Sequence, residues 1–194
     1  IIFFILIFGF DASAVSVKDH RIAVIVNDQI ITSYDVVQRM KINAILAGVN
    51  ITSENNERLA KVVVEELIQE KLKKEKTIEY EISISDQEYF QYEKSYYNKR
   101  GFSKDDLLDV FEANKIDYKV FKNYLTGEIS WQKLIAGMYY RLTSASDIEI
   151  EEIISKNPEI LMDQAKDIVI QRQLDLKGTK LLRDMLNEAT IEYK

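Results

Sequence analysis

The chain has 194 residues, a formal net charge of −6, one proline, six glycines and no cysteine. This length suits one domain, or one domain with an appendage, and a hydrophobic content of 46% argues against global disorder. The mild acidity disfavours a general nucleic-acid binder, and the lack of cysteine excludes disulfides, Cys-liganded zinc and a Cys nucleophile. Abundant Glu, Lys, Leu and Ile with so little Pro and Gly predict a mainly helical protein.

The first residues are typical of a secretory signal that lacks its start. Residues 1–10 form an uninterrupted apolar run, shorter than the about 20 residues that span a bilayer. Residues 12–14 (Ala-Ser-Ala) fit the small-x-small rule for cleavage. We interpret residues 1–14 as a signal peptide cleaved after Ala14, so that the mature chain lies outside the cytosol without stable membrane insertion. A buried strand and an uncleaved anchor are the alternatives for this run.

Two distant segments predict strands. Residues 22–26 form a β-branched apolar run, and Asn27 and Asp28 tolerate the positive φ of a tight turn before a return strand at residues 29–32. A lone hairpin is marginally stable in water. The only other strand-like segment is residues 190–193. We therefore predict that the chain end pairs with the N-terminal hairpin in a small antiparallel sheet.

Helical signals occupy the rest of the chain. Ser33 caps a first helix, Val36 and Val37 belong to its apolar stripe, and Gly48 ends it. Gly178 is interpreted as a weak point inside the last helix, because glycine in a helix interior costs about 1 kcal/mol relative to alanine. The predicted helices cover residues 34–47, 52 or 53 to about 76, 86–99, 103–114, 118–142, 147–156 and 159–187.

Serine and aspartate residues mark several helix starts. Ser85 with Glu88, and Ser146 with Glu149, form capping boxes, in which each side chain accepts a backbone N–H of the other residue. Asp117 caps the long helix that follows it. These signals fix the start of three helices independently of hydrophobic periodicity.

No constellation of catalytic residue types is present. The single histidine, His20, lies in a polar segment and is interpreted as a solvated side chain rather than a ligand or base. The sequence has no Gly-rich phosphate loop and no nucleophile elbow. Carboxylate pairs such as Glu65 and Glu66 are typical of exposed helix faces. We therefore expect a non-enzymatic protein with no catalytic residue, no metal site and no cofactor.

Aromatic residues gather on two successive helices. Tyr89, Tyr92 and Tyr96 share one helix face, whereas Phe90 and Tyr97 lie on another. Two interpretations stay open: core aromatics with hydroxyl tips in water, or one face that lines a crevice for extended, aromatic-rich polypeptides. For the second interpretation, the candidate peptide-binding residues are Phe90, Tyr97, Phe102, Met138 and Tyr140.

Residues 21–35, RIAVIVNDQIITSYD, resemble the opening of the SurA N-terminal domain family. That family begins with a hydrophobic strand, a Val-Asn-Asp-type turn, a short return strand and a Ser/Thr-x-x-Asp helix start. Weaker matches follow in the family's order, so the resemblance covers nearly all of the mature chain. They are Glu65-Glu66-Leu67-Ile68, Ile84-Ser85-Asp86, Gly101-Phe102-Ser103, residues 118–139, residues 148–154 and residues 168–193.

The resemblance also shows a departure from the family pattern. Relatives usually carry one or two parvulin prolyl-isomerase domains between the acidic helix and the last helix. Here Asn157 and Pro158 lead almost directly into the last helix, which leaves no room for a domain of about 90–100 residues. The resemblance implies an N-terminal chaperone domain over residues 15–157. Residues 158–194 would form a helix and strand that pack back on it.

The resemblance implies a fold and a function. The fold would be a mainly α, helical SurA-like chaperone core with a small antiparallel sheet formed by the N-terminal hairpin and the C-terminal strand. The function would be that of a periplasmic, ATP-independent chaperone that binds unfolded polypeptides, outer-membrane proteins above all, and no nucleic acid. Two alternatives are a prolyl isomerase, against which the missing parvulin segment argues, and a helical adaptor that binds one folded partner.

Overall fold

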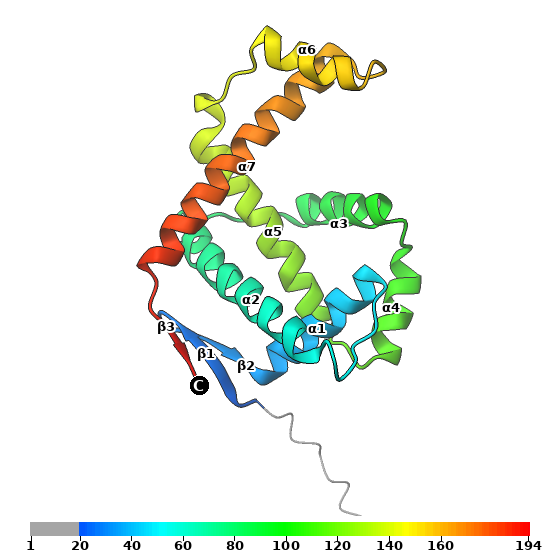
Figure 1. Ribbon diagram of the computed structural model, residues 1–194, viewed down its shortest axis with the longest axis vertical. Helices are drawn as coiled ribbons and strands as arrows, with labels where there is room; N and C mark the ends of the chain where they lie inside the picture. The colour runs from blue at the N-terminus through cyan, green and yellow to red at the C-terminus, as the bar shows by residue number, and fades with distance from the viewer. Residues whose placement is uncertain (1–19) are drawn as a thin grey trace, which may run out of the picture.

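The computed structural model describes residues 20–194, so the interpretation of residues 1–14 as a signal peptide lies outside the described residues. The described part is mainly helical with one small antiparallel sheet, as predicted (Figure 1). Its elements are β1 Ile22–Val26, β2 Gln29–Thr32, α1 Ser33–Ala47, α2 Asn56–Glu79, α3 Asp86–Arg100, α4 Lys104–Ala113, α5 Tyr118–Tyr139, the short 3-10 helix η1 Tyr140–Leu142, α6 Asp147–Lys156, α7 Met162–Glu188 and β3 Ile191–Tyr193.

The sheet joins the two ends of the described chain, which confirms the predicted pairing. Its strand order is β2-β1-β3, and both pairs are antiparallel. Val26 lies opposite Gln29 on one side and Ile191 on the other. Asn27 takes the positive φ that the turn requires, at 50°. Its backbone N–H donates to the Thr190 carbonyl at 2.8 Å, and its Oδ1 accepts the Thr190 N–H at 3.0 Å. The turn therefore fastens the last strand as well as the hairpin.

The first hydrophobic core lies between the sheet and the helices α1, α2 and α7. Val24, Val26 and Ile31 turn one face of the sheet inward and are fully buried. Residues of α2 with helical spacing and the C-terminal part of α7 cover this face. On α1, Val36 is buried but Val37 is 47% exposed, because adjacent helical positions differ by about 100° in direction. Placing Val37 on the apolar stripe was therefore wrong.

Two helices start later than the sequence indicates. The α2 helix begins at Asn56, because Thr52 and Asn55 first bond each other's backbone N–H groups in a separate turn, at 2.8 and 3.4 Å. The α7 helix begins at Met162 rather than 159, because Pro158 lies in a turn closed by the Ile160 N–H and the Asn157 carbonyl at 3.0 Å.

Most of the other predicted helix ends are confirmed. Both capping boxes form, and Gly48 and Gly101 end their helices in the left-handed conformation. The cap of α1 is Thr32, which forms a capping box with Asp35, and not Ser33. In a capping box the acidic partner lies three residues after the cap, which is where Asp35 stands relative to Thr32.

The helix α5 runs through the middle of the molecule, and α2, α3 and α7 pack against it (Figure 1). Its first half joins α3 and α4 in a second core around Phe111 and Phe121. Its second half pairs with α7 around Trp131, Leu134 and Leu174. The helix α5 thus connects the second core to the core that it shares with α7.

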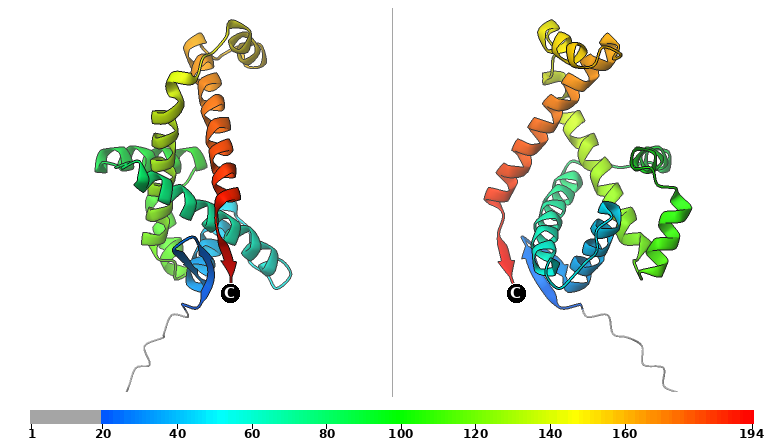
Figure 2. Two further views of the ribbon diagram at one scale, coloured as in Figure 1. Left: turned by 90° about the vertical axis from the view of Figure 1, so that its left-hand side faces the viewer. Right: turned by 45° about the vertical axis from the view of Figure 1, so that its right-hand side comes forward.

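Beyond this body, α6 and the N-terminal part of α7 form a projecting arm (Figure 2). Ile150 and Ile153 of α6 pack against Ala165 and Val169 of α7 in a small separate core. The arm lies far from the sheet, at the opposite end of the molecule (Figures 1 and 2). Among residues 20–194, no helix combines the length and the hydrophobicity needed to cross a membrane.

Candidate functional site

The aromatic residues of α3 are mostly structural. Tyr96 and Tyr97 point in different directions from α3, yet both are buried, at 7% and 5% exposure. The ring centroid of Phe121 lies 5.6 Å from that of Tyr96 and 6.5 Å from that of Tyr97. Phe111 contacts the same ring edge-on at 5.3 Å. These contacts favour the interpretation of the tyrosines as core residues.

A buried carboxylate fixes the polar ends of these tyrosines. Glu93 is 4% exposed, and its Oε1 accepts hydrogen bonds from the hydroxyls of Tyr89 (3.1 Å), Tyr97 (3.4 Å) and Tyr118. Its Oε2 accepts from Lys104 Nζ at 2.8 Å. Burial alone raises the pKa of Glu93, but Lys104 and Tyr118 outweigh burial and lower it. Burial and this carboxylate raise the pKa of Tyr89 and of Tyr97 to about 12.

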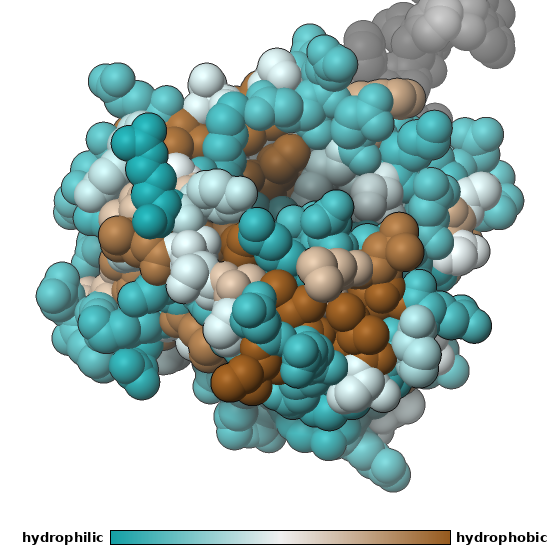
Figure 3. Space-filling view, turned by 90° about the horizontal axis from the view of Figure 1, so that it is seen from above, coloured by the Kyte–Doolittle hydropathy of each residue, from teal (hydrophilic) through white to brown (hydrophobic). Residues whose placement is uncertain are grey.

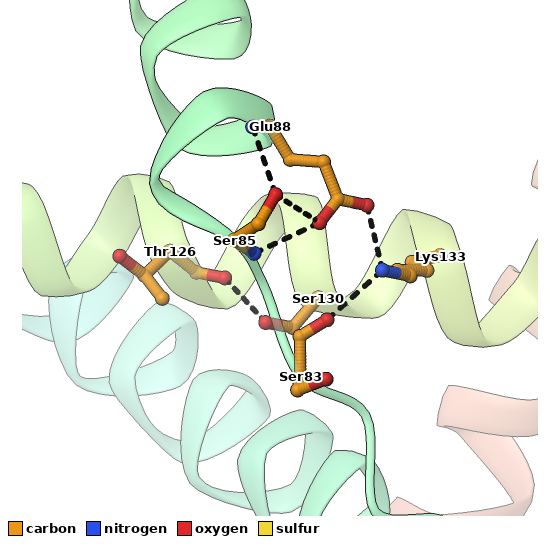
Figure 4. Close-up of polar contacts among 6 residues, drawn as sticks. All are labelled: Ser83, Ser85, Glu88, Thr126, Ser130 and Lys133. Carbon is orange, nitrogen blue, oxygen red and sulfur yellow. Dashed lines mark hydrogen bonds and ion pairs between the residues drawn. The ribbon is translucent and has the colours of Figure 1, made fainter.

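The N-terminus of α3 is attached to α5 by a second ionic contact, shown in Figure 4. Glu88 caps α3 through Ser85 and also contacts Lys133 Nζ of α5 at 2.6 Å. The same ammonium donates to the Ser83 carbonyl at 2.9 Å. Lys133 and the backbone and hydroxyl of Ser85 lower the pKa of Glu88 to about 2. The start and the middle of α3 are therefore held in place by charged hydrogen bonds.

The helices α1, α2, α3 and α5 line a solvent-open pocket of about 460 Å³, which we call the central cavity. Arg39 of α1 lies at its wall, 3% exposed, with both terminal nitrogens bonded to the carboxylate of Glu70. The guanidinium lies 4.4 Å from the ring centroid of Tyr124. The lining residues are Arg39, Asn43, Leu46, Ala47, Glu66, Gln69, Glu70, Lys73, Tyr96, Arg100, Tyr124 and Glu128.

A second cavity of about 420 Å³, between α2, α5 and β2, shares part of this lining. The Arg39–Glu70 pair and the Lys73–Glu128 pair, at 2.9 Å, contribute to both cavities. Burial raises the pKa of Glu70 despite the opposing effect of Arg39. Sequence reasoning missed this site. A usable signal was present, because Arg39 stands between Val36 and Met40 on the buried stripe of α1.

The arm exposes large apolar side chains to solvent. Figure 3, seen from the α6 end, shows hydrophobic side chains gathered among hydrophilic ones on this face. We define the arm surface by its exposed apolar residues around η1, α6 and the start of α7. They are Tyr140 (59% exposed), Leu142 (70%), Ile148 (79%), Leu161 (69%) and Met162 (68%).

The five residues predicted to bind peptide do not form one surface. Phe90 and Tyr140 are exposed, at 57% and 59%, on α3 and η1. Phe102 is half-buried against the core around Phe121, and Met138 is half-buried against the core around Trp131. Tyr97 needs correction, because its ring packs inside the core and offers no surface to a polypeptide.

No residue group in the described part of the chain suggests a metal centre. Among residues 20–194, no three or more His, Cys, Asp or Glu side chains are arranged to hold a metal ion. His20 is exposed, and its ring centroid lies 5.1 Å from that of Tyr34.

A family profile and a solved structure match the chain. The family profile described as SurA-like N-terminal domain matches residues 1–135. One matching solved structure comes from a study of PEB4 and the periplasmic protein Cj1289, described as two structurally related SurA-like chaperones in Campylobacter jejuni. It is 18% identical, with a TM-score of 0.37, over 71% of this chain and 50% of that chain. The chain thus spans half the length of that structure. A search of curated proteins gives no match.

Proposed function

The chain belongs to the family of SurA-like N-terminal domains, and we propose that it is an ATP-independent periplasmic chaperone for unfolded outer-membrane and other exported proteins. The observation that carries this proposal is the arm surface. Four apolar side chains there, Leu142, Ile148, Leu161 and Met162, are each at least 68% exposed on η1, α6 and the start of α7. Large exposed apolar side chains that gather in one region of a surface mark interaction sites.

The energetics of the arm surface suit weak and broad binding. Full burial of a Leu, Ile or Met side chain contributes about 1.5–3 kcal/mol. Ordering of an unfolded chain and loss of its translational freedom offset much of that gain, so we expect micromolar affinity. Acidic residues of α6, such as Glu149 and Glu152, lie among the apolar ones and keep the arm hydrated. Tyr140 belongs to the arm surface, whereas Phe90 is exposed separately on α3, and these are the two predicted binding residues that we retain.

Light scattering tests the proposal. An unfolded porin is diluted from urea with and without an equimolar amount of the purified protein. We expect the wild-type protein to suppress aggregation without nucleotide. An Ile148→Ser, Leu161→Ser, Met162→Ser triple variant should lose most of the suppression while keeping its melting temperature, because all three side chains are exposed.

A matched triple variant tests whether the effect belongs to the arm. Val49, Ile51 and Val62 are 48%, 39% and 48% exposed around the α1–α2 connection, and their replacement by serine should leave suppression unchanged. A wild-type protein that leaves aggregation unaltered would refute the holding function. Equal losses in the two triple variants would refute the arm as the binding surface.

We further propose that the protein is not itself a prolyl isomerase. The helices α6 and α7 are joined by residues 157–161 only. This is the position at which the resemblance to the SurA family leads us to expect a parvulin domain. A segment of that length is far below the size of a domain. An isomerisation assay on a proline peptide should give the uncatalysed rate, and a rate above it would contradict this part of the proposal.

A further inference from the structure

The arm carries most of the net negative charge of the chain. Residues 140–167, which span the arm surface, include seven acidic and three basic side chains, a net charge of −4. The other 166 residues together have a net charge of −2. The exposed apolar side chains of the arm surface therefore stand among an excess of carboxylates.

Four of these seven carboxylates have a local role in the arm itself. Asp147 and Glu149 lie in the first turn of α6, and Asp163 lies in the first turn of α7. A negative charge at this position stabilises the N-terminus of a helix. Glu152 forms an ion pair with Lys156, four residues further along α6. The stability of the two helices therefore accounts for these four acidic residues.

The remaining three carboxylates, Glu151, Glu159 and Asp167, have no such role. All three are exposed, and their side chains have no hydrogen-bond or ion-pair partner within the described part of the chain. Glu151 is three positions after Ile148 in α6, so these two side chains are neighbours on the helix surface. Glu159 lies two residues before Leu161, in the connection between α6 and α7. Free carboxylates thus adjoin the exposed apolar side chains.

The basic side chains of the arm do not neutralise these three carboxylates. Arg141 and Lys166 are exposed and form no ion pair among residues 20–194. Lys156 and, more weakly, Arg172 lower the pKa of Glu152. Both of these cations therefore act on a carboxylate that already has its partner.

Repulsion between carboxylates also remains within the arm. Glu151 is four positions after Asp147 in α6, and Asp167 is four positions after Asp163 in α7. Like charges at this spacing destabilise a helix. A cation supplied by a bound polypeptide would relieve this repulsion, so it adds a favourable interaction that the arm lacks by itself.

We propose that the arm surface selects unfolded segments that carry Lys or Arg side chains next to apolar ones, and disfavours segments with Asp or Glu at those positions. The inference rests on the proposed chaperone function, because it names the class of client segment that the arm surface takes. Apolar contact supplies the affinity, and opposite charge supplies selectivity and faster association. A single exposed ion pair changes an affinity by up to about fivefold, so several pairs together should give about tenfold.

Fluorescence anisotropy with three matched peptides tests this inference. The labelled peptides share the pattern Leu-x-Phe-x-Leu-x-Phe, have blocked ends, and carry Lys, Gln or Glu at every x. In about 0.01 M salt the Lys peptide should bind about tenfold more tightly than the Glu peptide, with the Gln peptide between them. In about 1 M salt this preference should fall to about twofold or less, because salt screens exposed charges.

A triple variant tests whether the selectivity belongs to the free carboxylates of the arm. The variant Glu151→Gln, Glu159→Gln, Asp167→Asn should reduce the preference for the Lys peptide over the Glu peptide to about threefold or less. Its affinity for the Gln peptide should stay unchanged, because the apolar side chains are intact. The triple serine variant of the arm surface should instead bind all three peptides weakly.

A matched variant in the body of the molecule controls for net charge. Glu65→Gln, Asp109→Asn, Glu112→Gln removes the same three charges from exposed positions of α2 and α4, away from the arm (Figure 1), and should keep the preference. If both charge variants lose the preference equally, the effect is one of net charge and the assigned selectivity is wrong.

The wild-type protein separates this inference from the proposed function. Equal binding of the Lys, Gln and Glu peptides overturns the selectivity and leaves the arm surface as a binding surface. Failure of all three peptides to bind refutes the arm surface together with its selectivity.

Discussion

Gly178 of α7 lies against Ile135 of α5 so closely that a Cβ atom on residue 178 would be 3.3 Å from Ile135 Cγ1. The same atom would be 3.5 Å from Nε1 of Trp131. Glycine here permits the close approach of the two helices that connect the body to the arm. The sequence interpretation of Gly178 as a weak point captured its low helix propensity but not the contact that compensates for it.

Substitutions at Gly178 should therefore depend on size. Gly178→Ala should be close to neutral, because a gain of about 0.5–1 kcal/mol in helix propensity opposes a contact that requires Ile135 to shift. Gly178→Leu should destabilise the protein by about 1–3 kcal/mol through overpacking. Urea denaturation measures both values.

Gly137 of α5 supplies the control for this prediction. A Cβ atom there would meet nothing within 4 Å, so Gly137→Ala should stabilise the protein by about 0.5–1 kcal/mol. A Gly178→Leu variant as stable as wild type would show that the two helices do not meet as described.

The buried Glu93 should be important for the packing of α3. Glu93→Ala leaves the hydroxyls of Tyr89, Tyr97 and Tyr118 without their acceptor, and should cost about 3 kcal/mol in the free energy of unfolding. Lys104→Met removes only the half-exposed cation of the same cluster, and should cost about 1 kcal/mol or less. Chemical denaturation distinguishes the two. Equal losses would indicate that the ion pair, and not the tyrosine hydroxyls, is the stabilising part.

Signals that depend on residues close in sequence predicted most helix ends correctly. They could not predict the contacts between different helices. The capping boxes at Ser85 and Ser146 and the glycine stop at Gly48 depend on residues within one turn, so they fixed helix ends correctly. The strand at residues 191–193 was found by elimination, because a hairpin needs a third strand. The sequence could not decide whether the adjacent residues Tyr96 and Tyr97 are core or surface residues. They point to different sides of α3, and both are buried only because other helices pack on both of these sides.

The central cavity was missed for the same reason. Its wall combines residues from four helices, and the Arg39–Glu70 pair joins positions on α1 and α2 that no periodicity relates. A single helix shows only that Arg39 interrupts an apolar stripe. The arm surface was also missed, because Ile148 and Leu161 have sequence contexts typical of ordinary amphipathic helix ends. Only the packing of α6 on α7 shows that neither side chain is covered.

The capping contact of Glu88 should make stability depend on pH in the acid range. The pKa of Glu88 falls from 4.5 to about 2 in the folded protein, mainly through its bond with Lys133. A lowered folded-state pKa contributes stability that is present above pH 4.5 and is lost as the pH falls from there toward 2. Glu88→Gln should therefore melt below wild type at pH 6, and this difference should shrink on acidification.

Melting temperatures from pH 2 to 7 test this expectation. Glu65→Gln is the control, because Glu65 is exposed on α2 and has no hydrogen-bond or ion-pair partner within residues 20–194. Its difference from wild type should show no comparable trend. If the difference in melting temperature between Glu88→Gln and wild type stays constant down to pH 2, the contact is not ionic in origin.

Asn27 should stabilise the sheet in two separable ways. It takes a φ of 50°, and its Oδ1 accepts the Thr190 N–H that leads into β3. Asn27→Gly keeps the backbone conformation but loses the side-chain bond to Thr190 and the exposed one from Asn27 Nδ2 to Glu75 Oε2 at 3.0 Å, and should cost about 1 kcal/mol in the free energy of unfolding. Asn27→Ala loses the bond and also strains the backbone, which adds about 1–2 kcal/mol. Asp28→Ala, in the same turn, should change stability by less than about 0.5 kcal/mol.

Chemical denaturation gives the free energy of unfolding of the three Asn27 and Asp28 variants, and hydrogen exchange at the Thr190 amide reports whether β3 detaches first. Equal costs for Asn27→Gly and Asn27→Ala would show that the side-chain hydrogen bonds to Thr190 and Glu75, and not the turn conformation, carry the whole contribution of this residue.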